Sequence, residues 1–181
     1  MTTDDELRRM TIGEPRRHDA PITLAEYDPA WPLLYAREAD RIRAALGDRV
    51  VLLEHTGSTS VPGLAAKPII DMTLAVADTT AEGDYVPPLE AAGYVLRIRE
   101  PDWYEHRLFK GTDPDVNLHV FSTGCEEIGR MLRFRDRLRS SPEDRALYLA
   151  RKRELATRTW RYTQNYADAK SAVVAEILAR G

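Results

Sequence analysis

The stretch that most constrains this chain is HTGSTSVPGLAAKPIIDMTLAV, residues 55–76, in which a loop of small residues precedes a single acid. The runs around the loop, RVVLLEHT and KPIIDMTLAVA, are rich in aliphatic residues, which predicts two buried strands. The glycine, serine and proline residues between them predict a sharp turn. A packed core alone explains neither that loop nor the aspartate, because a carboxylate buried without a partner is costly.

The rest of the sequence predicts further strands and then helices. Residues 31–46 have apolar side chains at helical spacing, with Pro32 in the first turn and Gly47 as a stop. Residues 94–100 predict a strand, residues 106–122 a hairpin around the GTDPD turn, and everything from Glu126 onward helices. Strands first and helices last predict an α+β fold, an α/β-type sandwich whose C-terminal third is helical.

Composition predicts a cytoplasmic protein with no membrane partner. A length of 181 residues, 43% hydrophobic and 30% charged, predicts one domain over residues 21–181 after a charged, mobile tail over residues 1–20. A short helix or a partner-binding arm is the alternative for that segment. The net charge of −3 creates no overall attraction to nucleic acid or membranes. The single cysteine excludes an internal disulfide, and no apolar stretch is long enough for a membrane span or a signal peptide. Oligomeric state is left open.

The Gly-Ser loop has the features of a phosphate site. Backbone N–H groups at the start of a helix lack intrahelical partners, and such groups bind anions. Gly57 lets the backbone approach a ligand closely, while Ser58 and Ser60 add hydroxyl donors. The same residues are equally compatible with a tight turn whose serines cap the next turn.

Asp71 lies on the face of its predicted strand opposite to Ile70 and Met72, because side chains alternate along a strand. The simplest use of a carboxylate there is to hold a divalent cation, Mg²⁺ or Mn²⁺, beside the phosphate of the loop. An ion pair with Lys67 or with an arginine of the later helices is the structural alternative.

Six blocks of sequence follow one another in a characteristic order: YDPAW, HTGSTSVPGLAAKPIIDM, HRLF, NLHVF, RFRDRLR and YADAK. In these blocks the chain resembles the GrpB family, from about residue 21 to the end. The resemblance implies the nucleotidyltransferase superfamily, with its mixed β-sheet flanked by helices. It also implies a nucleotide or coenzyme A-like ligand, because family members occur fused to dephospho-CoA kinase.

The superfamily pattern that this resemblance implies is Gly-Ser or Gly-Gly, about a dozen residues, and then acid–apolar–acid. Gly57-Ser58 and Asp71-Met72-Thr73 fit this frame, except that Thr73 replaces the second acid. Two-metal phosphoryl transfer uses two or three carboxylates, so the replacement puts catalysis in question more than binding.

His119 is a candidate catalytic residue, because the strand VNLHVFS offers a histidine where the superfamily has a third acid. Asp71 is both the first candidate metal ligand and the other candidate catalytic residue. His55 and His119 could complete a site for Mn²⁺ or Zn²⁺ with it. Each histidine is also compatible with a hydrogen-bonded strand residue.

Basic residues are concentrated in the helical third, with eleven arginines and lysines against four acids between Arg130 and Arg161. They are compatible with a solvated helix face, with a phosphate-binding lid and with a polyanion surface. Nucleic acid is the less favoured partner, because no exposed aromatic residues interleave with them. The candidate phosphate-binding residues outside the loop are Lys67, Arg107, Arg133, Arg135, Arg139 and Lys170.

Together these patterns predict a nucleotidyltransferase-like protein that binds a nucleotide or another small phosphorylated ligand. Metal-dependent nucleotidyl or phosphoryl transfer is the activity they favour. Two alternatives remain open. One is a catalytically weak module that binds a nucleotide or a coenzyme A-like molecule, and the other is an interaction domain that uses the basic helices.

Overall fold

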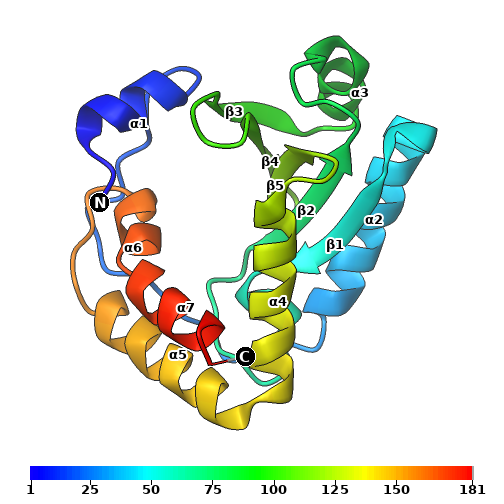
Figure 1. Cartoon of the computed structure of the whole chain (residues 1–181). Coiled ribbons are helices and arrows are strands. Elements are labelled where there is room, and N and C mark those ends of the chain that lie inside the picture. Colours follow the sequence, from blue (N-terminus) through cyan, green and yellow to red (C-terminus); the bar gives the residue numbers. More distant parts are fainter. Residues whose placement is uncertain (181) are drawn as a thin grey trace.

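A five-stranded mixed sheet forms the centre of the computed structural model, which describes residues 1–180 (Figure 1). The strand order is β1-β2-β5-β4-β3, and only β2 and β5 run parallel. This confirms the predicted mixed sheet. The strands are β1 (Leu52–Thr56), β2 (Ile70–Val76), β3 (Val95–Glu100), β4 (His106–Thr112) and β5 (Asp115–Ser122).

The described residues also form seven helices, and the last four confirm the helical C-terminal third. Three precede or interrupt the strands: α1 (Asp4–Met10), α2 (Trp31–Leu46) and α3 (Val86–Ala91). Four follow them: α4 (Glu126–Ser140), α5 (Pro142–Ala156), α6 (Thr163–Asp168) and α7 (Ser171–Leu178). Within residues 1–180, no helix has both the length and the apolar character that crossing a membrane requires.

One face of the sheet packs on α2 and α3 and forms the main core. Alternation along β2 directs Met72 and Leu74 to this face, where they meet Ile42 of α2 and Leu118 of β5, all with no exposed surface. The side chains that alternate with them, including Asp71 and Thr73, point to the opposite face. The sheet therefore offers a polar second face whose composition is set by the same alternation.

The loop between β1 and β2 joins the sheet to the C-terminal helices. Val61 and Leu64, both without exposed surface, pack with Leu138 of α4, Tyr148 of α5 and Ile177 of α7. In Figure 1, α5, α6 and α7 lie apart from the strands, with α4 running between the two groups. The loop is thus held between the polar face of the sheet and the helical third.

Residues 1–20, expected to be a mobile tail, are packed against the rest of the protein. A capping box between Thr3 and Glu6 caps the N-terminus of helix α1, and Leu7 of this helix is buried. The backbone N–H of Ile12 donates to the carbonyl of Arg97 in β3 at 2.8 Å. Capping and these contacts give the charged segment a fixed place that its composition did not indicate.

Candidate functional site

Gly57 brings the backbone of the loop directly against Asp71. Its φ angle is +66°, and a Cβ atom built on it would lie 2.3 Å from Oδ2 of Asp71. Only glycine fits such an approach, because any side chain would overlap the carboxylate. Ser58 and Ser60 follow in a short 3₁₀ turn, Ser58–Ser60. The loop and the acid therefore share one site.

Asp71 is held by an amide and has no basic partner in the part of the chain that the structure describes. It lies opposite Asn117 on the parallel pair β2 and β5, and Nδ2 of Asn117 donates to Oδ1 of Asp71 at 2.7 Å. No lysine or arginine forms an ion pair with it within residues 1–180. Burial raises the pKa of Asp71, an effect that the Asn117 hydrogen bond and the nearby lysines oppose.

Three lysines without an ion pair lie near this acid, and we call them the lysine cluster: Lys67, Lys152 and Lys170. Lys110 also lies near it but is paired with Asp115. Lys152 is 2% exposed, and its ammonium donates to the carbonyl of Ala65 at 2.5 Å. Burial, and next the charge of Lys170, lowers the pKa of Lys152 to about 7. Burial also lowers the pKa of Lys67 and of Lys170. Among the described residues, no member of the cluster has a carboxylate within ion-pair distance.

Tyrosines from α5 and α6 line the lysine cluster. The Nζ atoms of Lys67 and Lys170 lie 5.7 and 4.6 Å from the centre of the Tyr166 ring, and that of Lys152 lies 5.3 Å from the Tyr148 ring. Cation–π contacts of this kind disperse positive charge without neutralising it. The Tyr166 hydroxyl is buried and has no hydrogen-bond partner within residues 1–180. The lysine cluster therefore has an excess of positive charge, and the Tyr166 hydroxyl is a hydrogen-bond donor without an acceptor among the described residues.

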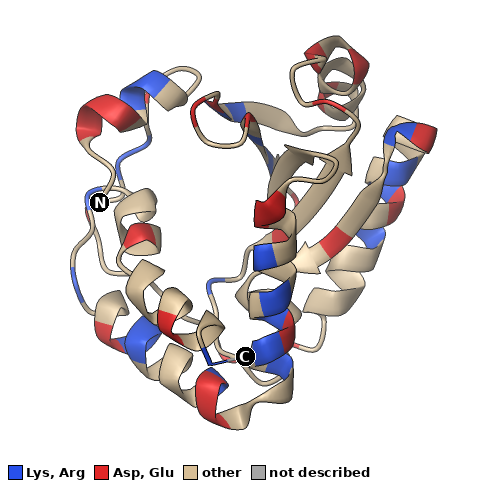
Figure 2. Ribbon diagram, in the orientation of Figure 1, with Lys and Arg blue, Asp and Glu red and all other residues tan. Residues whose placement is uncertain are grey.

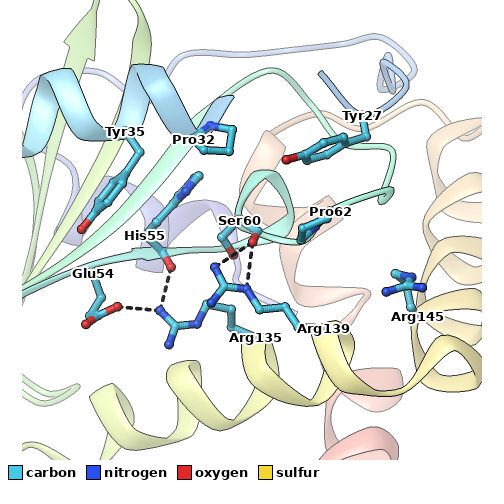
Figure 3. Close-up of a pocket in the computed structure, with 10 residues that line it drawn as sticks. All are labelled: Tyr27, Pro32, Tyr35, Glu54, His55, Ser60, Pro62, Arg135, Arg139 and Arg145. Atoms are coloured by element: carbon cyan, nitrogen blue, oxygen red, sulfur yellow. Dashed lines mark hydrogen bonds and ion pairs between the residues drawn. The ribbon is translucent and has the colours of Figure 1, made fainter. Parts of the chain in front are cut away.

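Other candidate residues lie on the far side of the loop, around a separate pocket of about 410 Å³ (Figure 3). There Arg135 donates to the Glu54 carboxylate at 2.7 Å and to the His55 carbonyl at 3.0 Å. Arg139 donates to the carbonyl of Ser60 at 2.8 and 3.0 Å. These arginines hold β1 and the loop through backbone carbonyls, and Asp71 does not line their pocket.

The three-residue metal site expected from Asp71, His55 and His119 does not form. His55 lies opposite Met72 in β1 and so faces the core side, where it stacks on Tyr35 at 4.7 Å with an interplanar angle of 7°. Within residues 1–180, no group of three His, Cys, Asp or Glu residues could hold a metal ion. Thr56 is the residue that pairs with Asp71, and because side chains alternate along a strand, its neighbour His55 points to the other face.

The remaining basic candidates are paired or remote. Arg107 forms ion pairs with Glu82 at 2.7 Å and Glu105 at 3.1 Å, away from the loop. Arginines recur along α4 (Figure 2), and most basic residues between 130 and 161 contact an acid. In that segment Arg133, Arg145 and Lys152 have no such partner among the described residues. The basic stretch is therefore largely neutralised.

Thr73, at the position of the missing acid, is a structural residue. It is fully buried, and its Oγ1 lies 2.9 Å from Oγ1 of Thr56 and 3.7 Å from Sδ of Met131. His119 lies beside Thr73 on β5, with Nδ1 3.0 Å from Nε2 of His106. Asp71 is therefore a carboxylate of the polar face without a basic partner among the described residues, whereas Glu54, opposite Thr73, is paired with Arg135.

Sequence reasoning missed Lys152, Asn117 and Tyr148 as members of the site. Lys152 was one of many basic residues in the helical third. Its spacing from Tyr148, four residues earlier on α5, is the signal that could have shown a shared inner face. Asn117 shares the face of His119 by alternation, but its partner Asp71 depends on the parallel pairing of β2 with β5.

We expect Gly57→Ala to destabilise the protein more than Gly63→Ala does. Both glycines have positive φ angles, +66° and +78°, but a Cβ at Gly63 has nothing within 4 Å. Gly57 has a ψ angle of −173°, a combination that other residues adopt only at a cost on the order of 1–3 kcal/mol, and the overlap with Asp71 adds to that cost. Urea unfolding of the two variants measures the difference. Equal losses would contradict the close approach.

Acid should destabilise the protein through His55. Burial, followed by the charges of Arg139 and Arg135, lowers the pKa of His55 to about 4 from 6.5. Between these values the unfolded chain binds more protons, so the free energy of unfolding should fall as the pH drops from 6.5 to 4, by about 3 kcal/mol from this residue.

Urea unfolding at pH 7, 5 and 4 tests this expectation with His55→Phe, which can still stack on Tyr35. The variant should have a flatter pH dependence, although lower stability at pH 7 from loss of the 3.0 Å contact with Thr59. His18→Phe, in the N-terminal segment, is the matched control and should keep the parent slope. An unchanged slope in His55→Phe would rule out a buried neutral imidazole there.

Comparison with known proteins places the chain in a family. Residues 21–180 match the family model described as GrpB protein. The chain is 61% identical over 178 residues to a UPF0157 protein of Halalkalibacterium halodurans, covering 98% of this chain and 91% of that one. It is also 33% identical over 165 residues to a dephospho-CoA kinase of Mycolicibacterium paratuberculosis, covering 77% of this chain and 40% of the kinase.

Solved structures give a consistent result. The crystal structure of GrpB from Enterococcus faecalis matches with a TM-score of 0.72 and 30% identity, over 87% of this chain and 96% of that one. Structures of the Cid1 poly(U) polymerase match at TM-scores of 0.44 to 0.48 and 14 to 16% identity, a likeness too distant to bear on activity. The chain belongs to the GrpB family.

Proposed function

We propose that this GrpB-family protein binds a phosphorylated small molecule, a nucleotide or a coenzyme A-like compound, between the loop and the lysine cluster. The observation that carries the proposal is the unbalanced charge there. Three lysines lie around a single carboxylate, and none of them has an acid within ion-pair distance in the described chain. An uncompensated buried charge is costly, and a bound phosphate would supply the missing counter-charge.

The donors near the cluster suit phosphate oxygens. Ser58 offers its hydroxyl and backbone N–H in the 3₁₀ turn, and the Tyr166 hydroxyl is buried without a partner. An unsatisfied buried hydroxyl costs about 1–3 kcal/mol, which a ligand oxygen would recover. The dephospho-CoA kinase relative supports the same class of ligand, because its name places a coenzyme A precursor in that protein's chemistry.

One divalent ion, Mg²⁺ or Mn²⁺, fits this site with Asp71 and the ligand's own phosphates as ligands. Oδ1 of Asp71 accepts from Asn117, whereas Oδ2, beside the backbone of Gly57, has no hydrogen-bond partner among the described residues. When bound, such an ion supplies Lewis-acid stabilisation of phosphate charge. Thr73, whose hydroxyl is paired with that of Thr56, supplies no carboxylate for a second metal ion.

Nucleotidyl or phosphoryl transfer is the activity that we propose for this arrangement. Gly57, Ser58 and the lysine cluster would hold the phosphates, and Asp71 the metal. His119 would act on the acceptor from the next position of the polar face. Ser60, Arg107, Arg135 and Arg139 are not part of the proposed set, because their partners lie elsewhere. Arg133 is left out because it is an exposed residue of α4.

A binding module without catalysis is the second candidate. The observation that favours it is the buried hydroxyl pair of Thr56 and Thr73, which occupies the place of the second acid. Under this alternative the ligand, and the stabilisation that it brings, would be the same. Release of pyrophosphate from a nucleoside triphosphate distinguishes the transferase from the module.

We expect ATP to raise the melting temperature of the protein. At about 100 times its dissociation constant, a ligand adds roughly 2.7 kcal/mol to the free energy of unfolding. Lys152→Met should abolish this increase while leaving the unliganded protein as stable as the parent or more so, because a buried ammonium is removed. Asp71→Asn should abolish only the additional increase that Mn²⁺ brings.

Arg133→Met is the matched control for these melts, since Arg133 is an exposed cation of α4 outside the proposed site. It should retain the full response to ATP and Mn²⁺. A parent protein that does not respond to millimolar ATP with Mn²⁺, or a Lys152→Met variant that responds fully, would refute the proposed site.

A further inference from the structure

A chain of hydrogen bonds runs across three strands to His119. Oε2 of Glu100, at the end of β3, lies 2.6 Å from Nδ1 of His106, and Nε2 of His106 lies 3.0 Å from Nδ1 of His119. His106 is 2% exposed and is stacked on Phe121 at 4.8 Å, with the edge of Trp103 at 5.1 Å. The middle imidazole therefore has a fixed position and both ring nitrogens engaged.

The order of donors and acceptors in this chain fixes the proton positions. An ionised carboxylate only accepts hydrogen bonds, so Nδ1 of His106 must be protonated and donate to Glu100. Nε2 of a neutral His106 then has a lone pair, and Nδ1 of His119 must donate to it. Nε2 of His119 is left with an unprotonated lone pair.

That Nε2 atom is accessible on the polar face. It has no hydrogen-bond partner within residues 1–180. In that range the Tyr166 hydroxyl is the one fully buried side-chain atom without a partner, so Nε2 of His119 keeps some exposed surface. His119 pairs across from Thr73, so Asp71 is two residues along the neighbouring strand, and the Cα atoms of Asp71 and His119 are about 8 Å apart at the usual rise and strand spacing. A ligand held by Asp71 would have its reacting group near this nitrogen.

We infer that His119 is the general base of the proposed transfer, and that Glu100 and His106 are positioning residues that set its tautomer. The inference rests on the proposed function for the identity of the reaction. It places a carboxylate–histidine–histidine relay on the face of the sheet that carries Asp71 and Thr73. The substrates are a nucleoside triphosphate and a hydroxyl-bearing acceptor.

In the proposed step, the acceptor oxygen bonds to the α-phosphorus while its proton passes to Nε2 of His119. The bond from that phosphorus to the bridging oxygen breaks, and its electron pair leaves with pyrophosphate. His119 becomes an imidazolium whose Nδ1 proton stays hydrogen-bonded to His106. Glu100 remains ionised and stabilises the new charge through His106. The proton is then lost to water.

The charges around His119 keep it neutral before the ligand arrives. Burial, and next the neighbouring His106 and Lys110, lowers the pKa of His119 to about 3. Lys110 is itself bound to Asp115 and Asn117, at 2.7 and 2.6 Å. The phosphates of a bound nucleotide would act in the opposite direction and favour the imidazolium that the reaction forms.

Nitrogen-15 NMR of the histidine-labelled protein tests the relay without reference to activity. At pH 7 we expect Nδ1 of His119 to have the shift of a protonated nitrogen and Nε2 that of an unprotonated one. His106→Phe, which keeps the stacking on Phe121, should move His119 toward the Nε2-protonated tautomer, whereas Glu100→Gln, whose amide oxygen still accepts, should not. His18→Gln is the control variant. A His119 with Nε2 protonated in the parent protein would overturn the inference.

Kinetics of ATP-dependent pyrophosphate release test the role as base. His119→Asn keeps a donor toward His106 but lacks Nε2, so the rate should fall by at least about 10²-fold while ATP still raises the melting temperature. A rate close to that of the parent would overturn the inference and leave the phosphate site intact. Loss of the ATP response in the parent protein would instead refute the proposed function, whatever the tautomer of His119.

Discussion

The excess positive charge beside Asp71 is the constraint on which the rest of the site depends. Lys152 is almost fully buried, and the lowering of its pKa from 10.5 to about 7 corresponds to roughly 5 kcal/mol of unfavourable interaction for its charged form. A fold selected for stability alone would replace such a residue by an apolar one. Its presence with Lys67 and Lys170 around one carboxylate is best explained by an anionic partner that restores the balance when it binds.

Three parts of the chain meet to create this arrangement. The parallel pair of β2 and β5 sets Asp71 beside Asn117 and Thr73 beside His119. The loop after β1 reaches the acid through Gly57 and is anchored by Val61 and Leu64 in the helical third. Lys152 of α5 and Lys170, the residue before α7, come to the same place from the helical third. Because the acid comes from the sheet and two of the three lysines come from the helical third, the site exists only when both parts are folded together.

Local patterns in the sequence were sufficient for the strands, the hairpin at β4–β5 and the helical third, because alternation and helical spacing depend on neighbours along the chain. They also placed Asp71 and Met72 on opposite faces of the same strand. The grouping of the basic residues could not be derived in this way. Arg135 and Arg139 hydrogen-bond to β1 and the loop, Arg107 pairs with Glu82, and Lys152 of α5 is buried near the acid. Which residues meet across elements depends on the packing of α4 and α5, and no periodicity within one helix contains that information. The packing of residues 1–20 was missed for the same reason.

The most direct test of the charge argument is the pKa of the Lys152 ammonium, measured by NMR titration of its side chain with and without saturating inorganic tripolyphosphate. The account predicts a pKa near 7 in the free protein and a rise toward the ordinary value of 10.5 when the polyanion is bound, because the added negative charge stabilises the ammonium. An ordinary pKa in the free protein, or a low one that the polyanion leaves unchanged, would contradict it.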